Sequence, residues 1–82
     1  MSPIKHNFIK FCDTIGWDAA IDYLSCVTTE LPEEQKDDVY LLCEMYYNSY
    51  NTKEYRINGD PDSDLCYKIR VFCMETLRDI LI

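Results

Sequence analysis

The chain has 82 residues, of which 48% are hydrophobic and 28% charged, and its formal net charge at pH 7 is −7. This length suits one domain, and the hydrophobic content is too high for a disordered chain. The excess of acid disfavours nucleic acids and anionic membranes as direct partners, because proteins that bind them carry basic surfaces. With two glycines and three prolines, the chain also lacks the turn signals of a many-stranded β fold. We expect a single helical domain over residues 1–82.

The first predicted helix follows Ser2-Pro3, where serine suits the N-cap and proline the first helical position. Gly16 is expected to end it, because glycine readily adopts the backbone conformation found at helix C-termini. Between these ends, apolar residues recur at helical spacing and predict one buried face. This face consists of Ile4, Phe8, Phe11, Cys12 and Ile15.

The second helix is predicted to begin at Trp17-Asp18, with Asp18 as its cap. It should end at Thr28-Thr29, since threonine is a weak helix former. The apolar spacing again predicts one buried face. Its residues are Trp17, Ala20, Ile21, Leu24 and Val27.

A third and longer helix is predicted to open at Leu31-Pro32-Glu33-Glu34 and to end at Asn51-Thr52. Proline suits its first position, and acids in the first turn are favoured by the helix dipole. Its predicted buried face consists of Val39, Leu42, Cys43, Tyr46 and Tyr50.

The chain after the third helix contains its strongest turn signal, Asn58-Gly59-Asp60-Pro61. Residues 53–57 alternate polar and apolar types but are too few to predict a strand. A final helix is expected after a cap at Asp62, Ser63 or Asp64. Four helices with short loops predict a compact all-α bundle. The buried face of the last helix is predicted to consist of Leu65, Cys66, Ile69, Phe72, Cys73, Leu77 and Ile80.

The five cysteines, at positions 12, 26, 43, 66 and 73, are odd in number and form no CxxC pair. Neither a disulfide framework nor a zinc site is expected from such spacing. Each cysteine falls at or beside an apolar helix position, which predicts free and mostly buried thiols. The N-terminal residues lack the features of a signal peptide, and no apolar run is long enough to span a membrane. A cytoplasmic location is the natural expectation.

The sequence offers little for catalysis. Its one histidine, His6, is expected on the solvent side of the first helix, and no phosphate-binding or nucleophile motif occurs. Asp60-Pro61-Asp62-Ser63-Asp64 resembles the start of an EF-hand loop. However, Leu65 and Val71 stand where that loop requires glycine and glutamate, so the aspartates are expected to cap the last helix. We therefore predict no catalytic site, no cofactor and no metal ion.

The third helix carries the candidate binding surface. Like charges recur four residues apart on it, as at Glu33/Asp37 and Glu34/Asp38, an arrangement that slightly destabilises a helix. Tyrosine, which is enriched in binding hot spots, is concentrated between residues 40 and 55. This predicts a face for a basic protein partner, with a solvated acidic face edged by packed tyrosines as the alternative. Its residues are Glu33, Asp37, Tyr40, Glu44 and Tyr47, flanked by Glu34, Asp38 and Leu41.

In size, charge and organisation the chain resembles the colicin-type immunity proteins, which are small, acidic four-helix inhibitors. That resemblance implies an acidic, tyrosine-bearing helix that neutralises a basic target. Small early phage proteins that inhibit host machinery share this general character. The Tyr-Tyr-Pro motif of the immunity proteins is absent, because Tyr46-Tyr47 is followed here by Asn48. No individual residue role is transferred from that family.

We therefore expect a non-enzymatic inhibitor or regulator, of the immunity, antitoxin or phage-antagonist kind, that occludes a basic surface of a target protein. The alternative is a homo-oligomer or a subunit of a larger complex, in which exposed apolar side chains meet another chain. The side chains expected to do so are Leu41, Met45, Met74 and Leu81.

Overall fold

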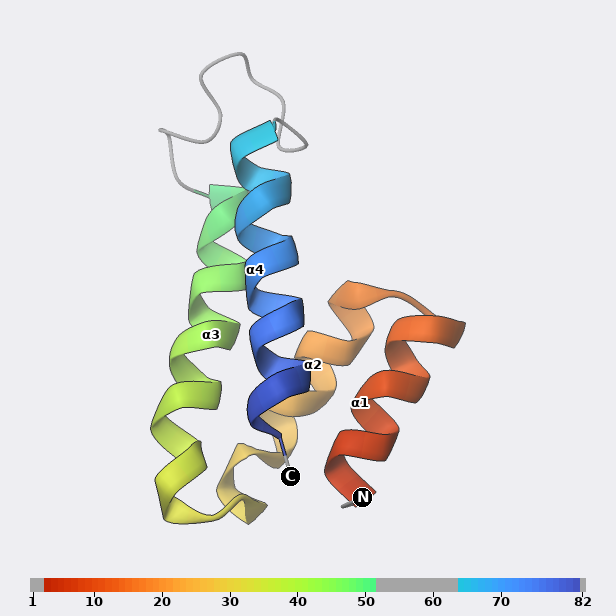
Figure 1. The fold of residues 1–82 in the computed structure, drawn as a ribbon, viewed down its shortest axis with the longest axis vertical. Coiled ribbons are helices and arrows are strands. Elements are labelled where there is room, and N and C mark those ends of the chain that lie inside the picture. The colour runs from red at the N-terminus through yellow and green to blue at the C-terminus, as the bar shows by residue number, and fades with distance from the viewer. Residues whose placement is uncertain (1–2, 52–63, 82) are drawn as a thin grey trace.

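The computed structural model describes residues 3–51 and 64–81 (Figure 1). Over these residues the chain forms no strand, and the predicted all-α fold with four helices is confirmed. The alternating segment 53–57 and the turn signal at 58–61 lie outside the described residues. The elements are α1 (Pro3–Thr14), α2 (Trp17–Val27), the short 3-10 turn η1 (Thr28–Glu30), α3 (Glu33–Asn51) and α4 (Asp64–Ile80).

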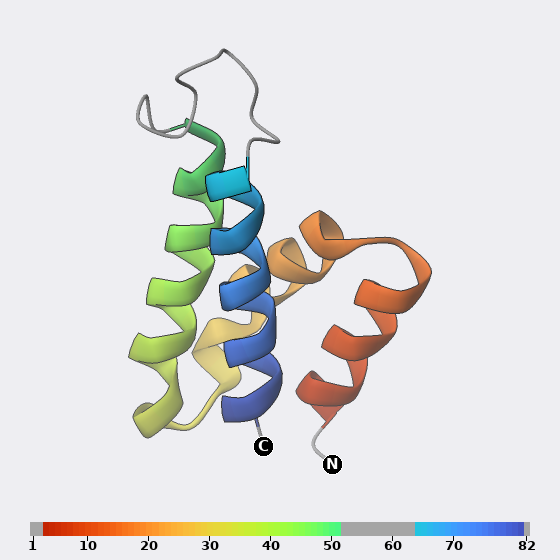
Figure 2. The same ribbon diagram turned by 45° about the horizontal axis from the view of Figure 1, so that its top comes forward.

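The four helices form two hairpins. Helices α3 and α4 lie side by side and antiparallel, α2 crosses behind them, and α1 lies on the flank away from α3 (Figures 1 and 2). Because α2 contacts both α1 and α3, it carries the packing between the two hairpins. The core therefore lies where α2 meets the α3–α4 pair.

Gly16 makes the turn between α1 and α2. Its φ of 140° lies in a region that side chains other than glycine rarely adopt, although a Cβ there would meet no atom within 4 Å. Its amide and that of Ile15 both donate to the carbonyl of Phe11, at 2.8 and 2.9 Å, and so satisfy the C-terminal end of α1. The predicted end of the first helix is correct.

Asp18 does not cap α2, in contrast to the prediction. The N-cap position is Gly16, and no side chain forms a capping hydrogen bond there. Asp18 lies inside the first helical turn, where its carboxylate is free to accept hydrogen bonds from another helix. The start of α3 also differs slightly, since Pro32 precedes the first helical residue and its carbonyl accepts from the amides of Gln35 and Lys36.

Two polar contacts fix the register of α3 against α4. At one end, Nε2 of the buried Gln35 donates to the carbonyl of Ile80 at 2.7 Å. At the other end, the buried thiol of Cys66 donates to the carbonyl of Ser49 at 3.1 Å. Buried polar groups need such partners, so a slip of one residue between the helices would leave both ends unsatisfied.

The core combines residues from every helix. Most members of the four predicted buried faces are buried or packed against the core, including Tyr50, which is half-buried. The buried residues of the cluster are Phe8, Ala20, Ile21, Leu24, Leu31, Val39, Leu42, Cys43, Tyr46, Cys73, Met74, Leu77 and Leu81.

Several predictions about individual side chains are wrong. Ile15, which follows the last turn of α1, is 67% exposed, and Leu65 and Phe72 of α4 are also exposed. Met74 and Leu81, expected to be exposed, are buried in the core. The buried side of α4 includes Arg70 and Met74, and this rotates Leu65 and Phe72 towards solvent.

All five cysteines are free thiols, but they are less uniformly buried than expected. Cys43, Cys66 and Cys73 are buried, Cys12 is half-buried and Cys26 is exposed. Burial raises the pKa of Cys43 and of Cys73 to about 11, which keeps both thiols protonated at neutral pH. Separately, none of the helices in the described part of the chain is long and apolar enough to cross a membrane.

The exposure of the thiols predicts their order of reaction with a thiol reagent. Cys26 should react rapidly in the native protein, because it is exposed and a thiolate is the reactive form. The three buried cysteines should react only as the protein unfolds, and all five should react in denaturant. Cys26→Ser should remove the fast phase alone. Rapid reaction of Cys43, Cys66 or Cys73 in that variant would contradict the burial described above.

Core packing predicts a contrast between two leucines. Leu24→Ala should lower the free energy of unfolding by about 2–5 kcal/mol, because it leaves a cavity in the core. Leu41→Ala, at a 59% exposed position, should change it by no more than about 0.5 kcal/mol. Denaturant titration of both variants measures the difference. Equal losses would mean that α2 does not occupy the centre of the fold.

Candidate protein-binding face

The predicted acidic stripe of α3 lies opposite the core side of that helix. We call it the acidic face and define it by the residues predicted above, all of which are exposed. Among its large apolar and aromatic side chains, Tyr40 is the most open, with 61% of its surface exposed. The acidic face consists of Glu33, Asp37, Tyr40, Glu44 and Tyr47, with Glu34, Asp38 and Leu41 beside them.

The two tyrosines of the acidic face differ in their attachment. The hydroxyl of Tyr47 donates its one proton to Oδ1 of Asp22. In its second hydrogen bond, with Oγ of Ser25 at 3.3 Å, the Tyr47 oxygen must therefore accept and Ser25 donate. The hydroxyl of Tyr40 forms no hydrogen bond with the described residues. Tyr47 is therefore held against α2, whereas Tyr40 is free to meet a partner.

Helix α2 extends the acidic face, which the sequence did not predict. Asp18 and Asp22 are exposed and lie one turn apart on α2, beside Tyr50 and Tyr47 of α3. Their spacing of four residues in an otherwise apolar helix was a visible signal, but it could not show which neighbouring helix they meet. Carboxylates of both helices thus lie beside the contact between α2 and α3.

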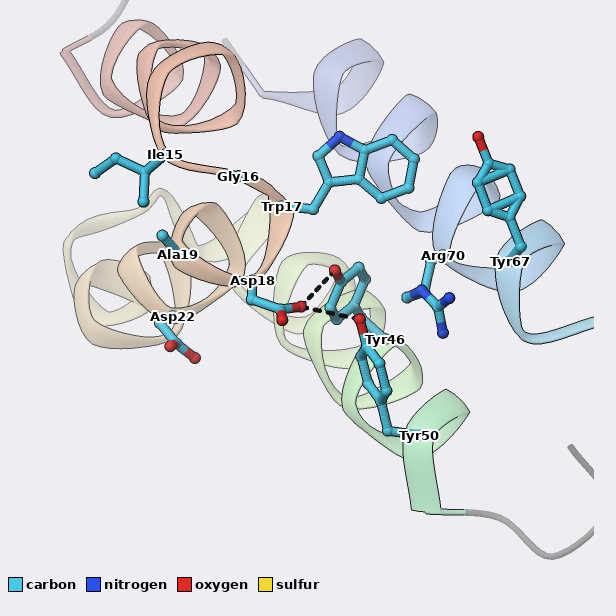
Figure 3. Close-up of a pocket in the computed structure, with 10 residues that line it drawn as sticks. All are labelled: Ile15, Gly16, Trp17, Asp18, Ala19, Asp22, Tyr46, Tyr50, Tyr67 and Arg70. Carbon is cyan, nitrogen blue, oxygen red and sulfur yellow. Dashed lines mark hydrogen bonds between the residues drawn. The ribbon is translucent and has the colours of Figure 1, made fainter. Parts of the chain in front are cut away.

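Asp18 accepts hydrogen bonds from two tyrosines through one oxygen. The hydroxyls of Tyr46 and Tyr50 donate to its Oδ1 at 2.7 and 3.1 Å (Figure 3). Arg70 completes this cluster from α4, with its guanidinium carbon 4.5 Å from the centre of the Tyr50 ring. The cluster joins three helices through hydrogen bonds and a cation–π contact.

The environment of these tyrosines changes their acidity. Burial strongly raises the pKa of Tyr46, and its proximity to Tyr50 and its hydrogen bond to Asp18 add to the effect. Burial also raises the pKa of Tyr47 and of Tyr50, and the hydrogen bonds to Asp22 and Asp18 add to the effect. Each hydroxyl donates to a carboxylate, so ionisation would place two negative charges in contact. All three therefore act as hydrogen-bond donors and not as bases.

A small cavity of about 200 Å³ opens on the acidic face between α2 and α3. Tyr40, Glu44 and Tyr47 line it from α3, together with Ser25 and Thr28 from the α2 side. Cys43, which is buried, also lines it. The acidic face thus offers a shallow recess beside its most exposed tyrosine.

The sequence also led to expectations about metal binding and about His6. No group of three or more histidine, cysteine, aspartate or glutamate side chains is placed to hold a metal ion among residues 3–51 and 64–81. His6 is exposed, as predicted. Asp60 and Asp62 of the EF-hand-like segment lie outside the described residues, and Asp64 begins α4.

Comparison with known proteins gives no match, whether with family models, with curated proteins or with solved structures.

The raised pKa of Tyr46 predicts a loss of stability in alkali. A tyrosine whose pKa is higher in the folded than in the unfolded state stabilises the fold below its ordinary pKa of about 10, and this contribution falls as the pH rises further. The free energy of unfolding should therefore decrease above pH 10. The buried thiols add a similar decrease that begins near pH 9.

Tyr46→Phe isolates this effect. The variant should lose about 1–3 kcal/mol at neutral pH, because it removes a hydrogen bond to a charged acceptor, and its further decrease above pH 10 should be shallower. Denaturant titrations from pH 7 to 11.5 measure both quantities. Tyr40→Phe, at an exposed ring, is the matched control and should retain the wild-type profile. An unchanged slope in Tyr46→Phe would contradict the assigned cause.

Proposed function

We propose that this protein is a non-enzymatic binding module that docks its acidic face on a basic surface of another protein and so inhibits or regulates it. The observation that supports this most is the exposed ring of Tyr40 among the carboxylates of α3. Acids alone would be enough for solubility, and an exposed tyrosine adds nothing to it. Tyrosine is, however, enriched in the residues that dominate binding energy.

The proposed mechanism is steric and electrostatic. Glu33, Asp37 and Glu44, together with Asp22 of α2, form one negative field that would steer a basic partner during the encounter. Tyr40 would then pack against the partner, and the neighbouring recess would accept one of its side chains. Occlusion of the basic surface would follow without any chemical step.

The same charge favours protein over nucleic acid or an anionic membrane as the partner. Carboxylates repel phosphate groups, whereas direct binding to either surface relies on neutralising them. We also propose a cytoplasmic site of action, because five free thiols are typical of a reducing compartment.

A homo-oligomer is the second candidate, and the exposed apolar side chains of α3 and α4 favour it. Leu41 and Met45 of α3 remain exposed, and Leu65 and Phe72 of α4 join them in place of the buried Met74 and Leu81. Size-exclusion chromatography with light scattering separates the two candidates. A stable dimer dissociated by Phe72→Glu would favour the oligomer, and a monomer favours the inhibitor.

Charge reversal on α3 should separate binding from stability. Glu33→Lys with Asp37→Lys should change the free energy of unfolding by about 1 kcal/mol or less, because the ion pair that it breaks, Glu33–Lys36, is exposed. Association with a partner captured from native lysate should slow by about tenfold or more at low salt and lose much of its salt dependence. Surface plasmon resonance at several ionic strengths measures both effects.

The matched control is Glu75→Lys with Asp79→Lys, which makes the same charge change at the same spacing on α4. It should retain nearly the wild-type association rate. Tyr40→Ala should instead accelerate dissociation, by an amount equivalent to about 2 kcal/mol or more if the ring is a hot spot. Equal behaviour of the two charge-reversed proteins would assign the binding to net charge alone and refute the proposed face.

A further inference from the structure

A second and larger cavity, of about 570 Å³, opens where the turn between α1 and α2 meets α3 and α4. Aromatic side chains from α2, α3 and α4 surround it (Figure 3). Asp18 and Asp22 of α2 also line it. This cavity therefore continues the negative surface of the proposed binding face without being part of the α3 stripe.

Its aromatic walls come in two pairs. Trp17 and Tyr67 are stacked, with ring centres 6.0 Å apart and an interplanar angle of 21°. Tyr46 and Tyr50 meet edge to face, with centres 5.8 Å apart. Tyr67 is 52% exposed, so one aromatic surface of the cavity is open to solvent. Aromatic faces attract organic cations through their negative quadrupole.

The charges that the cavity presents to solvent are negative. Asp18 and Asp22 are both exposed, and the described hydrogen bonds occupy Oδ1 of each, so both Oδ2 atoms retain acceptor capacity. Among the described residues that line the cavity, the one cation is Arg70, which is 4% exposed and lies over the ring of Tyr50. Because the accessible charge is that of the carboxylates, an incoming cation is favoured over an anion.

We propose that this cavity binds the guanidinium group of an arginine side chain supplied by the basic partner. A guanidinium stacks on aromatic rings and donates to carboxylates, and this cavity is lined by both kinds of group, with Tyr67 on its α4 side and Asp18 and Asp22 on its α2 side (Figure 3). The contact of Arg70 with Tyr50 is an example of the same pairing within the fold. The source of the arginine, a partner protein, rests on the proposed function. The affinity of the cavity for a guanidinium group is independent of that function.

The test uses N-acetyl-arginine amide as the probe and the fluorescence of Trp17, the one tryptophan of the chain, as the signal. Trp17 lines the cavity, so a bound guanidinium should change its emission saturably, with a dissociation constant on the order of millimolar for so small a ligand. N-acetyl-citrulline amide, which has nearly the same shape and no charge, should bind more weakly by about fivefold or more.

Variants locate the binding. Asp22→Asn with Tyr67→Leu should weaken the arginine probe by roughly tenfold, since it removes one carboxylate and the open ring. Asp79→Asn with Phe72→Leu removes an exposed acid and an exposed aromatic ring elsewhere on α4, and should leave the probe affinity unchanged. Thermal melting of both variants confirms that each is folded before titration.

Two results would overturn the inference. Equal affinity for the arginine and citrulline probes would show that charge is not recognised, and saturable binding of N-acetyl-glutamate amide in preference to both would make Arg70 the recognition group. The proposed function fails separately. If charge reversal at Glu33 and Asp37 leaves partner association unchanged while the arginine probe still binds, the proposed function is refuted and the guanidinium site is not. If the reversal slows association while the probe does not bind, the proposed function survives and the guanidinium site is refuted.

Discussion

One carboxylate oxygen, Oδ1 of Asp18, determines how α2 lies against α3. The ring of Tyr46 is 1% exposed, so its hydroxyl must find an acceptor inside the fold, and Asp18 supplies one at 2.7 Å. Once the start of α2 is placed there, the antiparallel course of the two helices brings Asp22 beside Tyr47 one turn later. Further along, it brings Thr28 near Tyr40. The recess beside Tyr40 and the larger cavity both follow from this pairing.

The helices were predictable because apolar periodicity and end signals agreed. Gly16 marks the boundary between α1 and α2 where the sequence indicated it. The buried side of α4 was less predictable, since a charged residue is normally assigned to the surface. Arg70 is nevertheless buried, stacked on Tyr50, and its presence on the core side turns Phe72 outwards. Periodicity shows that a helix has a buried face, but the contacts of its polar residues decide where that face is centred.

The exposure of the α3 stripe was predicted correctly, because its angular position opposite Val39, Cys43 and Tyr46 follows from helix geometry alone. The contribution of α2 to the acidic face was not predicted, because it depends on which helices become neighbours. Asp18 looked like a cap, since an aspartate at a helix start usually caps it. Here Gly16 occupies that position and Asp18 bonds across to α3 instead. No local signal distinguishes these two roles of an aspartate.

The aspartates of α2 serve both the fold and the proposed binding surface, which raises the question of whether the two roles compete. Asp18 and Asp22 each accept tyrosine hydroxyls through one oxygen. Because the second oxygen keeps its acceptor capacity, a cation can engage it without displacing Tyr46 or Tyr47. Its positive charge would also stabilise the carboxylates in the ionised form that those tyrosines require. A ligand that binds the folded form in this way stabilises it. Binding of a cation in the larger cavity should therefore strengthen the junction between α2 and α3.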